Sequence, residues 1–139
     1  MAISMSDMRG RCAVGALETA MVKRDQRRLI ADINRCTSWL RSYRRPYATA
    51  YAFNLSAGNA YLQGNLTEAM RCLTEAVEIF RATRLMLRFH CSQWILGRLM
   101  SSQVGIAKLQ ESEAWMRSQG IVEVRLMVDL HTPGFKKLA

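Results

Sequence analysis

Histidine and cysteine are the residue types in this 139-residue chain best suited to metal binding or nucleophilic catalysis. Zinc sites usually take their ligands in close pairs such as CxxC. Here the cysteines lie far apart, and only one neighbours a histidine, in the pair His90 and Cys91. Adjacent residues on a helix do not face each other, so this pair does not favour a thiolate and imidazole dyad. We expect no metal or cofactor, and four buried thiols in a reducing compartment: Cys12, Cys36, Cys72 and Cys91.

Motifs of the common phosphoryl-transfer and metal-dependent enzymes are absent from the sequence. The chain has no GxxxxGK[ST], no GxGxxG after a strand, no HRD or DFG pair and no HExxH. His90 lies in an apolar stretch and is expected to be a core residue, whereas His131, near the chain end, is expected to be exposed. The sequence therefore predicts a protein that is not an enzyme.

Basic residues concentrate near the N-terminus. The net charge is +9, and residues 1–50 hold ten Lys and Arg against four Asp and Glu. Such an excess suits an acidic protein partner, nucleic acid or an anionic surface. Arginines of residues 24–45, with Tyr43 and Tyr47 for base stacking, leave nucleic-acid binding open. No run of eighteen apolar residues is present, so no transmembrane helix and no membrane association are expected.

Apolar residues recur every three or four positions along most of the chain, which predicts helices and no strands. In the first helix, Met5, Met8, Cys12, Leu17, Ala20 and Met21 are expected to share a face. The helix near 85–100 is apolar all round and is expected to be the most buried. In the sixth helix, the candidate core residues are Ala107, Ala114, Trp115 and Met116. The expected helices span about 5–23, 25–43, 47–62, 66–82, 85–100, 102–118 and 122–130.

Residues 57–77 are the stretch around which the chain is organised. Two helical patterns meet at Gly64, which adopts positive φ without strain and suits a helix end. Asn65 or Thr67 is expected to accept from a free amide at the start of the second helix. The result is a helical hairpin packed through small residues such as Ala69 and Ala76.

This hairpin resembles a tetratricopeptide repeat. The family pattern of an opening aromatic, small contact residues and a turn glycine is met by Phe53, Ala57, Gly64, Ala69, Leu73 and Ala76. Two departures are that Ala60 occupies the usual tyrosine position, with Tyr61 beside it, and that no proline ends the repeat. The resemblance implies an all-α, short right-handed solenoid of stacked antiparallel hairpins. We expect six to seven helices in hairpins of 34 to 38 residues. One such domain is expected over residues 1–135, with a flexible tail at 136–139.

A second resemblance covers about 40 residues. The stretches 94–97, 113–121 and 133–135, with Gly105, resemble the C-terminal repeat tail of large bacterial signalling proteins, which carry a kinase or nucleotide-switch domain upstream. The family has an arginine and proline-rich step where this chain has residues 122–125, so the match ends there. The resemblance implies a fragment or a stand-alone relative of such a protein, located in the cytoplasm.

Together these features predict a scaffold or regulatory domain that binds a protein or peptide on a concave face. Arg44 and Arg45 favour an acidic partner. Nucleic-acid binding and a homodimeric helical regulator remain as alternatives. The expected partner-binding residues are Tyr47, Tyr51, Asn54, Tyr61, Arg44 and Arg45.

Overall fold

The computed structural model describes residues 1–138, and every regular element in this range is a helix. The prediction of an all-α chain with six helices and a short seventh is confirmed. The elements are α1 (Ile3–Thr19), α2 (Lys23–Ser42), α3 (Pro46–Leu62), α4 (Leu66–Ala82), α5 (Met86–Leu99), α6 (Gln103–Ser118) and α7 (Val124–His131).

Helix ends follow the capping residues in the sequence. Gly64 has φ of 80°, and Asn65 Oδ1 accepts from the backbone amide of Glu68 at 3.1 Å, which starts α4. Ser102 Oγ accepts from the amide of Gly105 at 3.2 Å and starts α6 in the same way. Gly120, with φ of 85°, ends α6. Turn chemistry thus separates the helices that the apolar spacing predicts.

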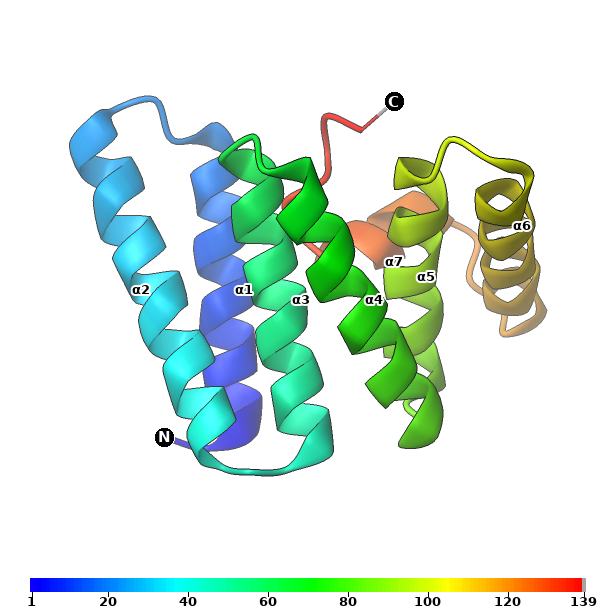
Figure 1. Cartoon of the computed structure of the whole chain (residues 1–139), viewed down its shortest axis with the longest axis horizontal. Coiled ribbons are helices and arrows are strands. Elements are labelled where there is room, and N and C mark those ends of the chain that lie inside the picture. Colours follow the sequence, from blue (N-terminus) through cyan, green and yellow to red (C-terminus); the bar gives the residue numbers. More distant parts are fainter. Residues whose placement is uncertain (139) are drawn as a thin grey trace.

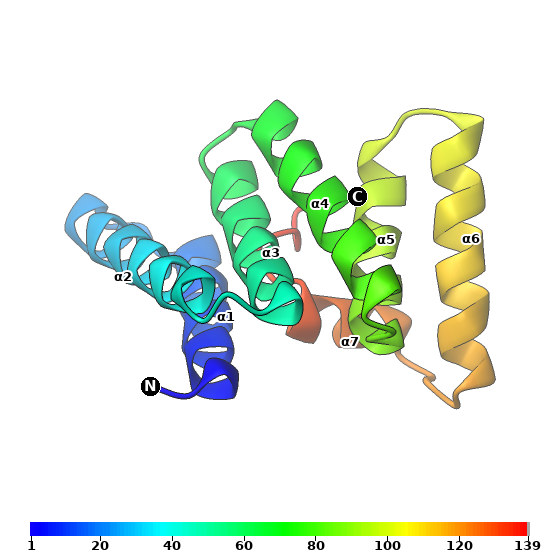
Figure 2. The ribbon, with the colours of Figure 1, turned by 60° about the horizontal axis from the view of Figure 1, so that its bottom comes forward.

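Consecutive helices pack against each other in chain order, and α1 also packs on α3 (Figures 1 and 2). Ala69 and Ala76 of α4 are fully buried, as expected for a hairpin whose helices approach through small side chains. α7 and the end of the chain cross one side of the row formed by α1, α3 and α5 (Figure 2). Among the helices of residues 1–138, none combines the length and apolarity needed to cross a membrane.

The apolar core forms two clusters that meet at α3. One joins α1, α2 and α3, and the other extends from α3 through α4 and α5 to the chain end. Every residue of α5 from 88 to 97 is buried, which confirms the prediction for this helix. The first hairpin, residues 3–42, is longer than expected because α2 reaches 20 residues, whereas the second, residues 46–82, falls within the expected range.

The predicted apolar face of α1 is wrong except at Leu17, which is buried. Met5, Met8 and Met21 are more than half exposed, and Cys12 is also exposed. The opposite side packs inward because Gly10 lets α1 approach α3: a β-carbon there would collide with the Leu55 side chain. Small size therefore decides the buried side of α1, which consists of Ser6, Asp7, Gly10, Ala13, Val14 and Leu17.

The core prediction for α6 is half right. Met116 is buried and Trp115 is partly buried, but Ala107 and Ala114 are exposed. A β-carbon on Gly97 of α5 would lie 2.6 Å from the carbonyl oxygen of Gly105, so the two helices touch through glycine backbone. This close approach turns the side of α6 that carries Gly105 and Ser112 toward α5.

Residues 124–138, called the C-terminal segment below, pack on the domain instead of leaving it at residue 135. Arg125 donates to the carbonyl oxygens of Phe135, at 2.6 Å from Nη2, and of Leu138, at 3.1 Å from Nη1. Leu138 is half-buried against the core, whereas Lys136 and Lys137 are exposed as predicted. Of the tail expected at 136–139, residue 138 lies against the core, and Ala139 lies outside the described residues.

Candidate functional site

Three rows of side chains lie on the side of α1, α3 and α5 that the C-terminal segment contacts, and we call this surface the inner face. Some members contact the segment, and the others continue the same side of each helix. Each row comes from one helix, with members three or four positions apart, as one side of a helix requires. It comprises Asp7, Arg11, Val14 and Glu18 of α1, Tyr51, Asn54, Gly58 and Tyr61 of α3, and Arg88, Cys91 and Trp94 of α5.

The helical part of the C-terminal segment lies on α5. The Arg125 guanidinium carbon is 5.2 Å from the centre of the Trp94 ring. Cys91 Sγ lies 3.8 Å from the carbonyl oxygen of Met127, and Val128 is fully buried. At the end of α7, Arg11 Nη1 of α1 donates to the carbonyl oxygen of Leu130 at 2.9 Å. The segment therefore crosses from α5 to α1.

The non-helical part, residues 132–138, bends at Gly134 and turns at residues 136–137, and it is held largely through its backbone. Glu18 accepts from two amides, that of Gly134 at 2.9 Å and that of Lys136 at 3.0 Å. Between them Phe135 is fully buried, with its ring centre 4.8 Å from that of Tyr61. A β-carbon on Gly58 would lie 2.5 Å from the carbonyl oxygen of Pro133, so the segment lies directly on the α3 backbone. The inner face thus holds a non-helical stretch of chain through two backbone amides and one buried aromatic ring.

A buried ion pair joins the first and third helices of the inner face. Asp7 of α1 accepts from Arg88 of α5, at 2.9 Å and 3.3 Å, and from Arg11 Nε at 3.0 Å. Both Asp7 and Arg88 are less than a tenth exposed. The Arg88 guanidinium carbon also lies 4.4 Å from the Tyr51 ring centre, a cation–π contact. The group carries one carboxylate and two guanidinium groups, so its net charge is positive.

Several buried polar atoms near this pair have no hydrogen-bond partner within residues 1–138. Leaving such an atom unpaired destabilises a fold by about 1–3 kcal/mol. Two of the atoms belong to the C-terminal segment, two to the inner face, and the fifth precedes Asp7. They are His131 Nδ1, Thr132 Oγ1, Asn54 Nδ2, Arg88 Nε and Ser6 Oγ. The apolar anchor at Phe135 is well packed, whereas the polar part of the contact is incompletely satisfied.

His131 is partly buried, not exposed as predicted. Burial, and after it the positive charges of Arg88 and Arg11, lower the pKa of its imidazole to about 4, while the charge of Asp7 opposes this shift. The ring is therefore neutral at pH 7. Protonation would add a third positive charge to a group that already holds two.

The sequence-predicted partner residues of α3 lie along one side of the helix. Tyr51 and Tyr61 are half-buried on the inner face, and Tyr47 extends the row by one turn, with its ring centre 5.9 Å from that of Tyr51. Asn54 is only 1% exposed and accepts from Ser92 Oγ at 2.9 Å. It therefore cannot touch a ligand in this arrangement, contrary to the expectation. Arg44 and Arg45 are exposed just before α3.

Sequence reasoning missed the inner-face residues of α1 and α5. Asp7, Glu18 and Arg88 were not singled out, because charged side chains on an otherwise apolar helix are usually solvent-exposed. The three-and-four spacing of Asp7, Arg11 and Glu18 in α1 was a usable indication of a shared face.

The C-terminal segment does not fill the inner face. On its α1 side a mainly apolar groove of about 500 Å³ is lined by Met8, Cys12 and Leu130, among others. On the other side a groove of about 570 Å³ contacts Tyr61 and Arg98.

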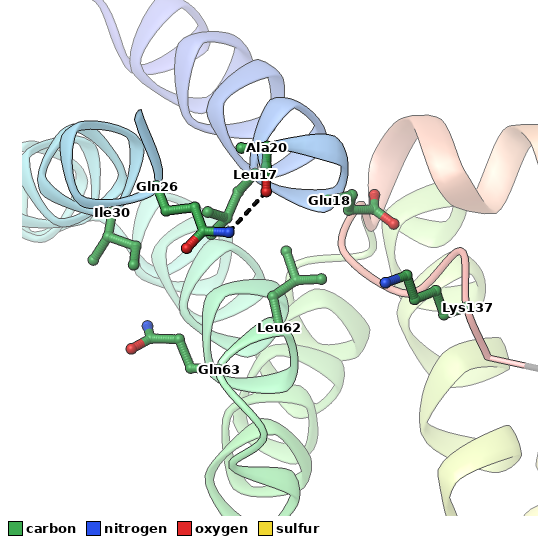
Figure 3. Close-up of a pocket in the computed structure, with 8 residues that line it drawn as sticks. All are labelled: Leu17, Glu18, Ala20, Gln26, Ile30, Leu62, Gln63 and Lys137. Atoms are coloured by element: carbon green, nitrogen blue, oxygen red, sulfur yellow. Dashed lines mark hydrogen bonds between the residues drawn. The ribbon is translucent and has the colours of Figure 1, made fainter. Parts of the chain in front are cut away.

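A smaller polar cavity of about 200 Å³ opens beside Lys137, between the C-terminal ends of α1 and α3 and the N-terminal end of α2 (Figure 3). Its one internal hydrogen bond runs from Gln26 Nε2 to the carbonyl oxygen of Ala20 at 2.7 Å. Glu18 reaches this cavity from α1, but its carboxylate is already bound to the backbone of the C-terminal segment. The cavity is therefore an edge of the inner face and not a separate binding site.

A second buried polar group lies between α5 and α6. His90 Nδ1 is 2.9 Å from Ser112 Oγ, and Gln93 Nε2 donates to the same hydroxyl at 2.8 Å. The His90 ring stacks on Trp115, and burial lowers its pKa. Ser112 is fully buried, so the group cross-links two helices and His90 is the core histidine that was predicted. In the part of the chain that the structure describes, no three His, Cys, Asp or Glu side chains are grouped to hold a metal ion.

Comparison of the chain with protein-family models, curated proteins and solved structures gives no match.

Proposed function

We propose that this chain is a non-catalytic protein-binding module that holds a polypeptide segment on its inner face. The observation that supports the proposal is the C-terminal segment itself. The inner face binds it through two backbone amides at Glu18 and one fully buried aromatic ring at Tyr61. Backbone contacts with one aromatic anchor are a common mode of peptide recognition.

Charge supports an acidic partner. Arg44 and Arg45 are exposed at the end of the α3 row that carries Tyr47, outside the C-terminal segment. Asp7 neutralises only one of its two guanidinium partners, Arg11 and Arg88. A peptide entering at Tyr47 would meet an excess of positive charge, which speeds association and favours acidic sequences.

The sequence resemblances suggest where such a module works. We propose a tetratricopeptide-like scaffold domain of a bacterial signalling protein, acting in the cytoplasm. Three of the four cysteines, Cys36, Cys72 and Cys91, are buried free thiols, which fits a reducing compartment.

Two observations favour alternative partners. Tyr43 is exposed next to Arg44 and Arg45, an arrangement that suits nucleic acid, and such binding would weaken steeply with salt. A homodimer is favoured by an apolar row that consists of Val122, just before α7, and of Leu126 and Leu130 of α7, each more than half exposed. Size measurement over a range of concentrations tests that alternative.

Selection of peptides from a random display library against the full chain tests the proposed function. A selected peptide is then titrated by calorimetry into the wild type, Tyr47→Ala and Tyr43→Ala. Both tyrosines are 36% exposed, but only Tyr47 continues the inner-face row. We expect Tyr47→Ala to weaken binding about tenfold, the effect of losing one aromatic contact. Tyr43→Ala should leave the affinity unchanged.

Two results would contradict the proposal. One is the failure of the library to yield any specific peptide. The other is equal loss of affinity in Tyr43→Ala and Tyr47→Ala, which would place binding on the arginine surface.

A further inference from the structure

The C-terminal segment makes the kind of contacts that a bound peptide would make. It reaches all three helices of the inner face. Its non-helical part, residues 132–138, contacts them mainly through backbone atoms and the Phe135 ring. Glu18 accepts from the amides of Gly134 and Lys136, and Phe135 between them is fully buried.

Several buried polar atoms in and beside this contact lack hydrogen-bond partners within residues 1–138. In this described range of residues, Thr132 is fully buried without a partner for its hydroxyl, and Asn54 and Arg88 on the inner face each keep an unpaired donor. Open grooves of about 500 and 570 Å³ flank the segment. It joins α6 through an exposed turn at Gly120, whose φ is 85°. Besides Phe135 and the two amides, the fully buried Val128 and the bond from Arg11 to Leu130 hold the segment, so its release has to break these contacts while α1 to α6 stay folded.

We propose that the C-terminal segment is an intramolecular ligand that occludes the inner face, and that a partner protein binds by displacing it with a segment of the same chemistry. This proposal rests on the proposed function and specifies its partner. The displacing segment is a short helix followed by a non-helical stretch with one aromatic residue.

The contacts define what that partner must carry. An aromatic side chain has to enter the place of Phe135 beside Tyr61. The amides directly before and after it have to be free to donate to Glu18, which excludes proline at both positions. The backbone that crosses α3 has to come as close as Pro133 does to Gly58, and a positive φ, as at Gly134, permits this approach.

The test measures binding of a fluorescein-labelled synthetic peptide of residues 122–138 to the full chain by fluorescence anisotropy. Wild type is compared with Phe135→Ala, which removes the anchor of the built-in segment but leaves the inner face intact. We expect the peptide to bind Phe135→Ala at least tenfold more tightly than the wild type. A peptide that itself carries Phe135→Ala should lose at least tenfold in affinity for this variant.

Leu126→Ala is the matched control. Leu126 belongs to the same segment but is 65% exposed, so its truncation should leave peptide affinity at the wild-type value. Glu18→Gln introduced into Phe135→Ala should weaken peptide binding, because the carboxylate is part of the inner face.

A folded Phe135→Ala that does not bind the peptide overturns this proposal. The proposed function would still stand if library-selected peptides bind that variant, and would fall with it if they do not. If the full chain forms dimers and the 122–138 peptide dissociates them, the proposal of a different partner protein is overturned, and the occupant of the inner face is a second copy of this chain.

Hydrogen exchange on the wild type decides the question if Phe135→Ala does not fold. Under the proposal, the amides of Gly134 and Lys136 exchange through local opening, before the amide of Leu55 in the core of α3. Exchange of all three amides only through global unfolding would overturn it.

Discussion

Replacement of Asp7 by Asn is the most direct test of how the inner face is held together. Asn keeps the shape of the side chain but removes its charge and one acceptor oxygen. Asp7 is 3% exposed and accepts two hydrogen bonds from Arg88 and one from Arg11. In the variant an amide NH₂ group would face guanidinium donors, so at least one bond is lost and the buried Arg88 has no counter-charge.

The size of the effect follows from burial. Removing one partner of a buried ion pair typically destabilises a protein by about 3–5 kcal/mol, because the remaining charge stays desolvated. Arg88 is 8% exposed, so it cannot rotate into water without disrupting its contacts with Tyr51 and Phe80. We therefore expect Asp7→Asn to fall in this range. Such a loss is a large part of the roughly 5–15 kcal/mol that stabilises a domain.

The assay is urea unfolding followed by circular dichroism, with Arg88→Met and the double variant completing a thermodynamic cycle. If the pair acts as a unit, the double variant should be less destabilised than the sum of the single variants, because no buried charge is left without its partner. Asp32→Asn is the matched control. Asp32 makes a similar pair with Arg9, whose side chain is 44% exposed, so the control should change stability far less.

Equal effects of Asp7→Asn and Asp32→Asn would refute this reasoning. So would strict additivity of Asp7→Asn and Arg88→Met. Either result would mean that the Asp7 pair is hydrated and that the C-terminal segment does not seal the inner face.

Three further predictions concern protonation and packing. The pKa of His131 is about 4 in the folded chain against an ordinary 6.5, so its contribution to the free energy of unfolding is complete above pH 6.5 and is lost as pH falls toward 4. In urea unfolding, the free energy of unfolding of the wild type should fall between pH 7 and 5 by about 1 kcal/mol more than that of His131→Gln, after a discount for the partial exposure of the ring. Gly15→Ala should raise the unfolding free energy by about 0.5–1 kcal/mol, because alanine favours helix over glycine and its β-carbon would meet no neighbouring element within 4 Å. Gly10→Ala should lower the unfolding free energy by about 1–3 kcal/mol, because its β-carbon would collide with Leu55. A change of the same sign in both variants would contradict the packing of α1. Ala76→Leu should destabilise the chain by about 1–3 kcal/mol in the same assay, because Ala76 is fully buried between α3 and α4.

The central hairpin could be predicted from sequence because its determinants are local. Gly64 adopts the positive φ that ends a helix, and Asn65 caps the next one, as the residue types indicated. The full burial of α5 followed from apolar residues on all its sides. Such features depend on a few neighbouring positions, and sequence periodicity reports them directly.

The buried side of α1 could not be predicted in the same way. Its methionines, Met5 and Met8, formed the more apolar pattern, yet the helix turns Ser6, Asp7 and Gly10 inward. The reason is long-range: Gly10 meets Leu55, and Asp7 meets Arg88 some 81 positions later. Hydrophobicity alone misassigns a helix when close approach and a distant countercharge decide its orientation.

The same argument applies to the residues predicted to bind a partner. The row of α3 residues from Tyr47 to Tyr61 does share one side, but Asn54 is covered, and Tyr61 already contacts Phe135. The segment that covers them had been expected to end near residue 135 in a flexible tail. Its contacts with α1 run from residue 134 back to residue 18, a separation no periodicity detects. If the inner face recognises a partner, that partner competes with the end of this same chain, so affinity measured on the intact protein reports the difference between two bound states.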